Sequence, residues 1–307
     1  MKSEHCGGTI HASEIEALHS FDESPSIQMV QPGPEWEDLD QRVTSHELAL
    51  AHNIQRALLP KRFPELPGFT LAGSCVTARQ VGGDFFDVLP VARDQVLLVV
   101  ADVMGKGVPA ALFAATLHTL LRTMAEWTHD PAELLSRANR LMFGELSEVD
   151  MFITAQIALA DFRHNRLTVA SAGHCPLLII NPEGEAKTLS PDGMPLGIVE
   201  VVRFREEHAS LDECSCALLY TDGLTEARNP QGEFFGEERL ATWLKKKVIQ
   251  SRTAAEIAQQ FEAEMKVFQS ETALTDDQTF LLLGRTPLGS LEAKVPVMQQ
   301  GKVAIGS

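Results

Sequence analysis

The sequence lacks several features that would place it in a special class of protein. Its apolar runs, such as residues 96–101, are far shorter than the roughly 20 residues that cross a bilayer, so we expect no membrane span. Positive charge is scarce: 26 Lys and Arg face 42 Asp and Glu, giving a formal net charge of −16. Such a balance argues against a nucleic-acid-binding surface. Residues 1–10 carry no apolar stretch typical of a signal peptide, so we expect a cytoplasmic protein.

Cysteines are few and scattered. The five are Cys6, Cys75, Cys175, Cys214 and Cys216. An odd, dispersed set predicts reduced thiols and not a disulfide framework. A zinc site at Cys214 and Cys216 would need a second ligand pair, which we do not find, so we interpret them as small apolar side chains on one face of a strand.

The first part of the chain predicts an arm and a helix. Residues 1–43 are polar and proline-punctuated, which predicts a mobile N-terminal arm. Thr44 and Glu47 fit a capping box, and apolar residues then recur at helical spacing until Pro60. We therefore expect a linker helix and connector at 44–67, with an apolar stripe that packs on the following domain or on a second copy of the chain.

Residues 68–286 predict one domain of mixed strands and helices, followed by a flexible tail at 287–307. Strands are expected at 69–76, 85–89, 95–103, 152–161, 166–172, 176–180, 215–221 and 278–283, and helices near 108–127, 131–146 and 254–268. Strands that follow one another as hairpins, mixed with pairs of helices, predict an α+β fold and not a doubly wound parallel sheet.

Four aspartates stand where a strand gives way to a loop: Asp84, Asp102, Asp222 and Asp276. Carboxylates suit hard cations such as Mg²⁺ and Mn²⁺. Each feature taken singly is more often a turn. Asp102 is harder to dismiss, because an acid that ends so apolar a strand is costly if it is buried without a partner. The agreement of residue type, placement and order favours a metal site.

Five segments carry a family resemblance: VGGDFFD at 81–87, ADVMGKG at 101–107, SAGHCP at 171–176, YTDGLTEA at 220–227 and TDDQTF at 275–280. In this order they resemble the motifs of the PPM-type (protein phosphatase 2C-like) metal-dependent protein phosphatases. The resemblance is to the bacterial branch named after stage II sporulation protein E and the sigma-factor-regulating phosphatases. It implies an αββα sandwich of two antiparallel β-sheets flanked by helices.

The resemblance also implies a site with two Mn²⁺ or Mg²⁺ ions. Asp102 matches the ligand shared by both ions, and the Val103 carbonyl matches a backbone ligand. Asp84 matches a ligand of one ion, and Asp222 and Asp276 match ligands of the other. Asp277 stays open as an alternative to Asp276. The implied reaction is hydrolysis of phosphoserine or phosphothreonine by a metal-activated water.

Other residues of these motifs have two interpretations each. Met104 stands where animal relatives carry a histidine that is proposed as the general acid, so the proton donor is open. Lys106 either attracts substrate phosphate or is simply solvated. His174 is expected to be structural, Asp87 is either an outer partner of a metal-bound water or merely polar, and Arg79 is expected on the surface.

The branch implies a substrate and leaves alternatives. Relatives act on phosphorylated anti-sigma-factor antagonist domains, so we expect such a partner here. One alternative is a phosphatase-like fold that acts as a regulator or scaffold in a partner-switching pathway. A second is a diguanylate cyclase, because residues 82–86 partly resemble its Gly-Gly-Asp-Glu-Phe signature, but the glutamate is absent.

Overall fold

The structure is a computed structural model that describes residues 37–250 and 253–286. The chain divides into two units, Met1–Ser45 and His46–Ser307. The predicted tail at 287–307 lies outside the described residues, as does the predicted arm apart from residues 37–43.

The predicted start of the linker helix is wrong. Helix α1 spans Glu37–Leu58 and so begins seven residues before Thr44. Thr44 and Glu47 lie within a longer helix-forming stretch, where adding a residue to an existing helix is easier than starting a new one. The predicted end is close, because α1 stops just before Leu59 and Pro60.

Ten strands form two five-stranded sheets, and every pair of neighbouring strands is antiparallel. The first sheet has the order β1 (Phe69–Val76), β10 (Gln278–Arg285), β9 (Cys216–Tyr220), β6 (Leu177–Ile180), β7 (Ala186–Leu189). The second has the order β2 (Phe85–Ala92), β3 (Gln95–Val103), β4 (Ile153–Asp161), β5 (Arg166–Ala172), β8 (Glu206–Ser210). The predicted α+β fold with two antiparallel sheets is confirmed.

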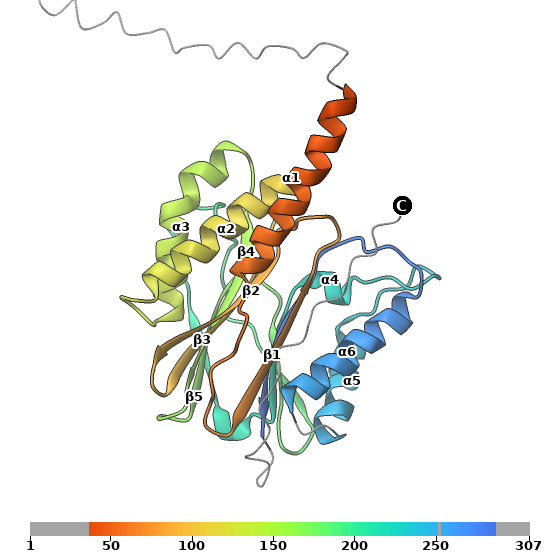
Figure 1. The fold of residues 1–307 in the computed structure, drawn as a ribbon. Helices are drawn as coiled ribbons and strands as arrows, with labels where there is room; N and C mark the ends of the chain where they lie inside the picture. Colours follow the sequence, from red (N-terminus) through yellow and green to blue (C-terminus); the bar gives the residue numbers. More distant parts are fainter. Residues whose placement is uncertain (1–36, 251–252, 287–307) are drawn as a thin grey trace, which may run out of the picture. The chain divides into compact units, whose positions relative to one another are not determined.

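Helices cover the outer face of each sheet (Figure 1). Helices α2 (Val108–Met124) and α3 (Pro131–Glu148) contact the second sheet, and α5 (Glu237–Gln250) and α6 (Ala254–Gln269) contact the first. The predicted caps form: Asp130 accepts a hydrogen bond from the Glu133 amide at 2.7 Å, and Thr253 accepts one from the Glu256 amide at 3.2 Å. None of the helices within 37–250 and 253–286 is long and apolar enough to cross a bilayer.

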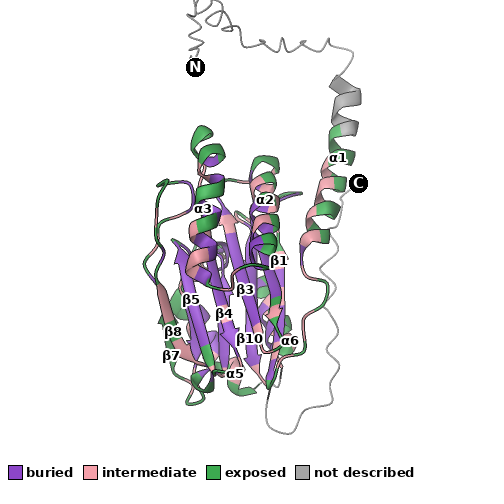
Figure 2. Ribbon diagram, turned by 90° about the vertical axis from the view of Figure 1, so that its left-hand side faces the viewer, coloured by how far each residue is buried: buried purple, intermediate pink, exposed green. Residues whose placement is uncertain are grey.

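The core lies between the two sheets and beneath the helices. Figure 2 shows buried residues along the central strands and exposed residues on the outer faces of α2 and α3. Strand β3 is buried on both sides, because one face meets the other sheet and the opposite face meets the helices. That position explains its unbroken apolar sequence, which differs from the alternation of a strand with one wet face.

Five elements were not predicted: β7, β8, α5, the single turn α4 (Asp222–Thr225) and the 3-10 turn Leu211–Glu213. The edge strands β7 and β8 are short and largely polar, so they carry little apolar signal. The many charged residues of α5 mask its apolar positions, of which Leu240, Trp243 and Leu244 are buried. Cys214 and Cys216 are buried free thiols as expected, but their predicted place on one face of a strand is wrong, because Cys214 lies before β9 and packs in a different part of the core from Cys216.

Candidate metal centre

Antiparallel pairing brings the four strand-end aspartates together from two sheets. Asp84 directly precedes β2, and Phe85 pairs with Ala101, so Asp84 and Asp102 lie at the same end of the second sheet. In the first sheet Phe280 pairs with Tyr220, which places Asp222 and Asp276 at one end. The two ends are joined by the Thr221 hydroxyl, which donates a hydrogen bond of 2.8 Å to Asp84.

These carboxylates repel one another strongly enough to alter their ionisation. Burial raises the pKa of Asp84 well above its usual range, and the charges of Asp102 and Asp277 raise it further. Burial also raises the pKa of Asp102 to about 7, with Asp222 as the next contribution. The pKa of Asp222 is raised by burial and by Glu226 and Asp276. Acids of both sheets therefore affect the pKa of Asp102, which makes it the electrostatic centre of the group.

Lys106 is the cation found against this acid cluster. Its ammonium lies 2.9 Å from an Asp276 carboxylate oxygen and donates to the Thr275 carbonyl. The flanking Gly105 and Gly107 have φ of +88° and +82°, which other residues rarely adopt, so the glycines allow the turn that presents Lys106. Lys106 is therefore not simply solvated, because it forms an ion pair with Asp276, and its attraction of substrate phosphate stays a prediction.

Asp277 has a different surrounding from Asp276. It is buried, and its two oxygens accept hydrogen bonds from the backbone amides of Ala78 at 2.7 Å and Gly83 at 2.8 Å. Both oxygens of Asp277 therefore hold the loop that precedes Asp84. Asp276 is partly exposed beside Lys106, so of the two acids it is the one with an oxygen that can exchange a partner.

Glycines let the backbones approach closely around the acids. A Cβ atom on Gly83 would lie 2.6 Å from the Val103 carbonyl oxygen, and one on Gly223 would lie 1.9 Å from the Asp277 carbonyl oxygen. Side chains at either position would push apart the loops that carry Asp84 and Asp222. The glycine next to each aspartate is thus required by packing, and it keeps the Val103 carbonyl beside the acid cluster.

The remaining motif residues lie apart from this chemistry. His174 is buried, its ring lies 2.8 Å from the Thr154 hydroxyl, and burial lowers its pKa to about 4, so it is neutral at pH 7. Met104 is 42% exposed. Asp87 is tied to Arg122 by two bonds of 2.7 and 2.8 Å and so faces α2. Thr221, which orients Asp84, was missed from the sequence although it directly precedes Asp222.

The acid side chains are of the right chemical type for hard divalent cations, but they are not grouped around a single point. All side-chain donors are carboxylate oxygens, and the mutual rise of their pKa values marks an excess of negative charge that a cation relieves. Within the described ranges, no three His, Cys, Asp or Glu side chains stand close enough together to hold an ion. Asp276 is turned to Lys106, so an ion there has to replace an existing ion pair.

Comparison with known proteins places this arrangement in a class. Two antiparallel sheets with flanking helices and acids at one end form the fold of PP2C-type phosphatase domains. The SiaA-PP2C domain of Pseudomonas aeruginosa superposes with a TM-score of 0.70 at 28% identity, covering 80% of this chain and 98% of that domain. Residues 92–286 match the family "Stage II sporulation protein E (SpoIIE)". The chain belongs to this family, which excludes the cyclase interpretation of residues 82–86.

Two curated relatives are similar over most of the domain. Protein IcfG of Synechocystis is 29% identical over 221 residues, which are 63% of this chain and 35% of that protein. Phosphoserine phosphatase RsbU of Bacillus subtilis is 28% identical over 193 residues, which are 62% of this chain and 57% of that protein. The alignments thus span about a third to three fifths of the length of these relatives.

Asp277 generates a prediction about stability. Replacing Asp277 with Ala should leave the amides of Ala78 and Gly83 without acceptors, at about 1–3 kcal/mol for each buried amide. Asp277→Asn should cost less, because its remaining carbonyl oxygen still accepts one bond. Urea unfolding followed by circular dichroism measures both, and Glu183→Ala, which removes an exposed acid elsewhere, is the control. Equal stability of Asp277→Ala and the control would contradict this role.

Proposed function

We propose that this chain is a metal-dependent protein serine/threonine phosphatase that hydrolyses phosphoserine or phosphothreonine. The observation that carries the proposal is the electrostatically coupled acid cluster at the joined ends of two sheets in a fold of the PP2C type. Asp84, Asp102, Asp222, Asp276 and the Val103 carbonyl would hold two Mn²⁺ or Mg²⁺ ions. The central place of Asp102 supports its assignment as the ligand shared by both.

The chain's own residues would orient and expose the reacting groups. When bound, two such ions activate a water and neutralise charge on a phosphoryl group. Thr221 binds one oxygen of Asp84, and Asp277 binds the preceding loop, so Asp84 is held in place without an ion. Asp222 is exposed and Asp102 is partly exposed, so a phosphate on the surface of another protein can approach.

The proposed substrate is a phosphorylated anti-sigma-factor antagonist domain. Support comes from the family match, and from the similarity to RsbU, which bears the name phosphoserine phosphatase. Dephosphorylation would let the antagonist capture its anti-sigma factor and release a sigma factor. The exposure of Asp222 and the partial exposure of Asp102 and Asp276 suit a protein-borne phosphate better than a small molecule that needs an enclosing pocket.

The competing function is a catalytically weak regulator or scaffold that keeps the phosphatase fold. One observation favours it: the acids do not stand grouped around one ion in the described part of the chain. Direct measurement of Mn²⁺ binding separates the two functions, because a scaffold has no need for the ion.

The first test concerns metal dependence. The protein should hydrolyse a generic phosphomonoester only with added Mn²⁺ or Mg²⁺, and Asp102→Asn or Asp222→Asn should lower activity by more than about 100-fold, because each removes a proposed ligand. Calorimetric titration with Mn²⁺ should show weakened binding in the same variants. Asp150→Asn, which changes an exposed acid elsewhere, is the control. Activity that persists after complete metal removal contradicts the proposal.

The second test concerns the substrate. Offered phosphorylated antagonist domains from the same cell, phosphotyrosine peptides and nucleotides, the protein should act mainly on the phosphoserine or phosphothreonine of the antagonist. Phosphate release measures each rate, with Asp102→Asn as the blank. A preference for phosphotyrosine or nucleotides would overturn the assignment. Activity only on other phosphoserine proteins would support the phosphatase reaction but contradict the proposed antagonist substrate.

We also propose that α1 mediates a homodimer. Leu50 and Ile54 lie one turn apart on α1 and are 55% and 57% exposed, so their apolar stripe does not pack on the domain's own core. Replacing both with Glu should convert a dimer to a monomer in sedimentation velocity. Val267→Glu, at a 78% exposed position of α6, is the matched control. A wild-type protein that sediments as a monomer at high concentration rules the dimer out.

A further inference from the structure

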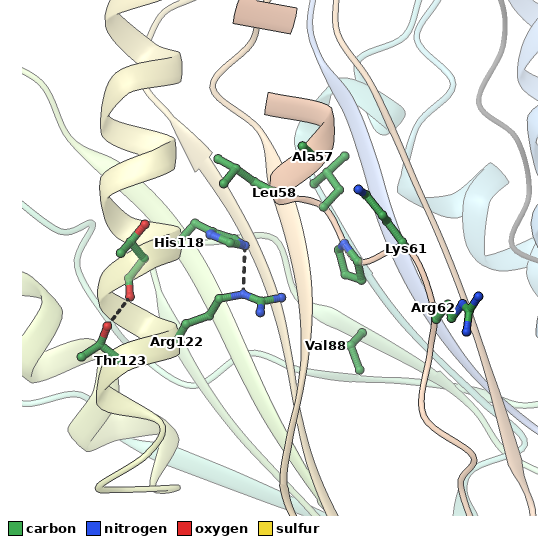
Figure 3. Close-up of a pocket in the computed structure, with 11 residues that line it drawn as sticks. Ala57, Leu58, Lys61, Arg62, Val88, His118, Arg122 and Thr123 are labelled. Carbon is green, nitrogen blue, oxygen red and sulfur yellow. Dashed lines mark hydrogen bonds between the residues drawn. The ribbon is translucent and has the colours of Figure 1, made fainter. Parts of the chain in front are cut away.

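A groove lies between the end of α1 and helix α2, away from the acid cluster (Figure 3). Its volume is about 600 Å³, within the range of small-molecule sites. One side is formed by the end of α1 and the connector, and the other by α2. The lining residues are Ala57, Leu58, Leu59, Pro60, Lys61, Arg62, Val88, His118, Thr119, Arg122 and Thr123.

The groove is positively charged in a strongly acidic chain. Lys61, Arg62 and Arg122 all line it, and no carboxylate does. The carboxylate behind it, Asp87, is buried and already bonded to Arg122 and to the Val88 amide. Burial raises the pKa of Asp87, but hydrogen bonds and charge interactions with His118 and Arg122 outweigh it and lower the pKa, so Asp87 is ionised and its charge is matched by groups already bonded to it. The positive charges of Lys61 and Arg62 therefore have no carboxylate partner among the residues that line the groove.

Several donors in the groove have no partner. Arg122 bonds to Asp87 through Nε and Nη2, which leaves its Nη1 free, and the side chain is 46% exposed. Within the described ranges, Lys61 and Arg62 form no ion pair. His118 is 95% buried, with Nε2 at 3.2 Å from both Arg122 and Asp87, and its Nδ1 has no hydrogen-bond partner. Because the Nδ1 atom of His118 is enclosed by protein, it is not a donor that the groove presents to a ligand.

The lining also has an apolar part. Leu58, Leu59, Pro60 and Val88 contribute aliphatic surface beside the cations, and the volume exceeds what one phosphate or carboxylate group fills. The combination suits a ligand with an anionic head and an apolar body. We propose that this groove is a second ligand site that binds a small organic anion, whose phosphoryl or carboxyl group contacts Nη1 of Arg122 and is attracted by the positive charges of the exposed Lys61 and Arg62.

The proposed site is independent of the phosphatase assignment, because it needs neither metal nor catalysis. Binding should therefore be measured on protein stripped of metal with a chelating resin. In that state the uncompensated acids of the other site repel anions, so an anion that binds reports on the groove. The probes are phenylphosphonate, benzoate, inorganic phosphate and neutral benzyl alcohol, followed by calorimetric titration.

Phenylphosphonate or benzoate should bind saturably, and the tighter of the two identifies the head group. Inorganic phosphate should bind more weakly by about tenfold, because it lacks the apolar body, and benzyl alcohol should not bind measurably. The variant Lys61→Ala/Arg62→Ala should weaken binding by about tenfold or more, because it removes two positive charges that attract the anion. Both side chains are exposed, so this variant should fold.

One comparison makes the result decisive. Arg163→Ala/Lys187→Ala removes two exposed cations elsewhere and should bind like the wild type. The proposal is overturned if no organic anion binds saturably, or if the Lys61/Arg62 variant binds as well as its control.

Discussion

Asp84 is a carboxylate almost fully enclosed by protein, with two further carboxylates close by, and this enclosure shapes the surrounding structure. Burial and repulsion both favour its neutral form. The pairing of Phe85 with Ala101 prevents Asp84 and Asp102 from separating, because both sit at the same end of a hydrogen-bonded strand pair. The repulsion among these acids is relieved either when some of them are protonated or when a cation balances their charge. A cation leaves every carboxylate ionised and available as a ligand.

The backbone around the acids explains how such a cluster is held. Thr221 receives a bond from the Thr279 amide on its hydroxyl and donates that hydroxyl to Asp84, so strands of the first sheet orient an acid of the second. Asp277 accepts a hydrogen bond from the Gly83 amide and so orients the loop before Asp84. Gly83 and Gly223 allow these contacts by leaving room for carbonyl oxygens. Uncharged donors, the Thr221 hydroxyl and backbone amides, thus fix the positions of Asp84 and its loop. The negative charge of the carboxylates can still be balanced by one cation or another.

The sequence predicted the parts of this arrangement that rest on apolar pattern and strand ends. The limits of β1, β3 and β5 are reproduced because their residues are buried and bounded by turns. The start of α1 was missed because a local capping pattern lies inside a longer helix. For the site, the family motifs indicated the four aspartates. They could not show that Lys106 pairs with Asp276, since that contact joins residues 170 positions apart through folding.

Strand β2 connects the two regions that carry function. Side chains alternate along a strand, so Phe86 points toward β1 of the other sheet, while Phe85 and Asp87 point toward α2. Asp84, just before the strand, faces the acid cluster on the side of Phe86. The end of α1 reaches both regions: Gln55 exchanges two hydrogen bonds with Gly82, two residues before Asp84, and Leu58 lines the cationic groove.

This geometry makes α1 the element through which one region can influence the other. Gly82 is confined between Gln55 and Asp277, because a Cβ atom on Gly82 would lie 2.0 Å from an Asp277 oxygen. A displacement of α1 therefore moves the loop before Asp84 or breaks the bonds of Gln55. The same end of α1 lines the groove through Leu58, so a ligand bound there would lie against the helix whose Gln55 holds Gly82.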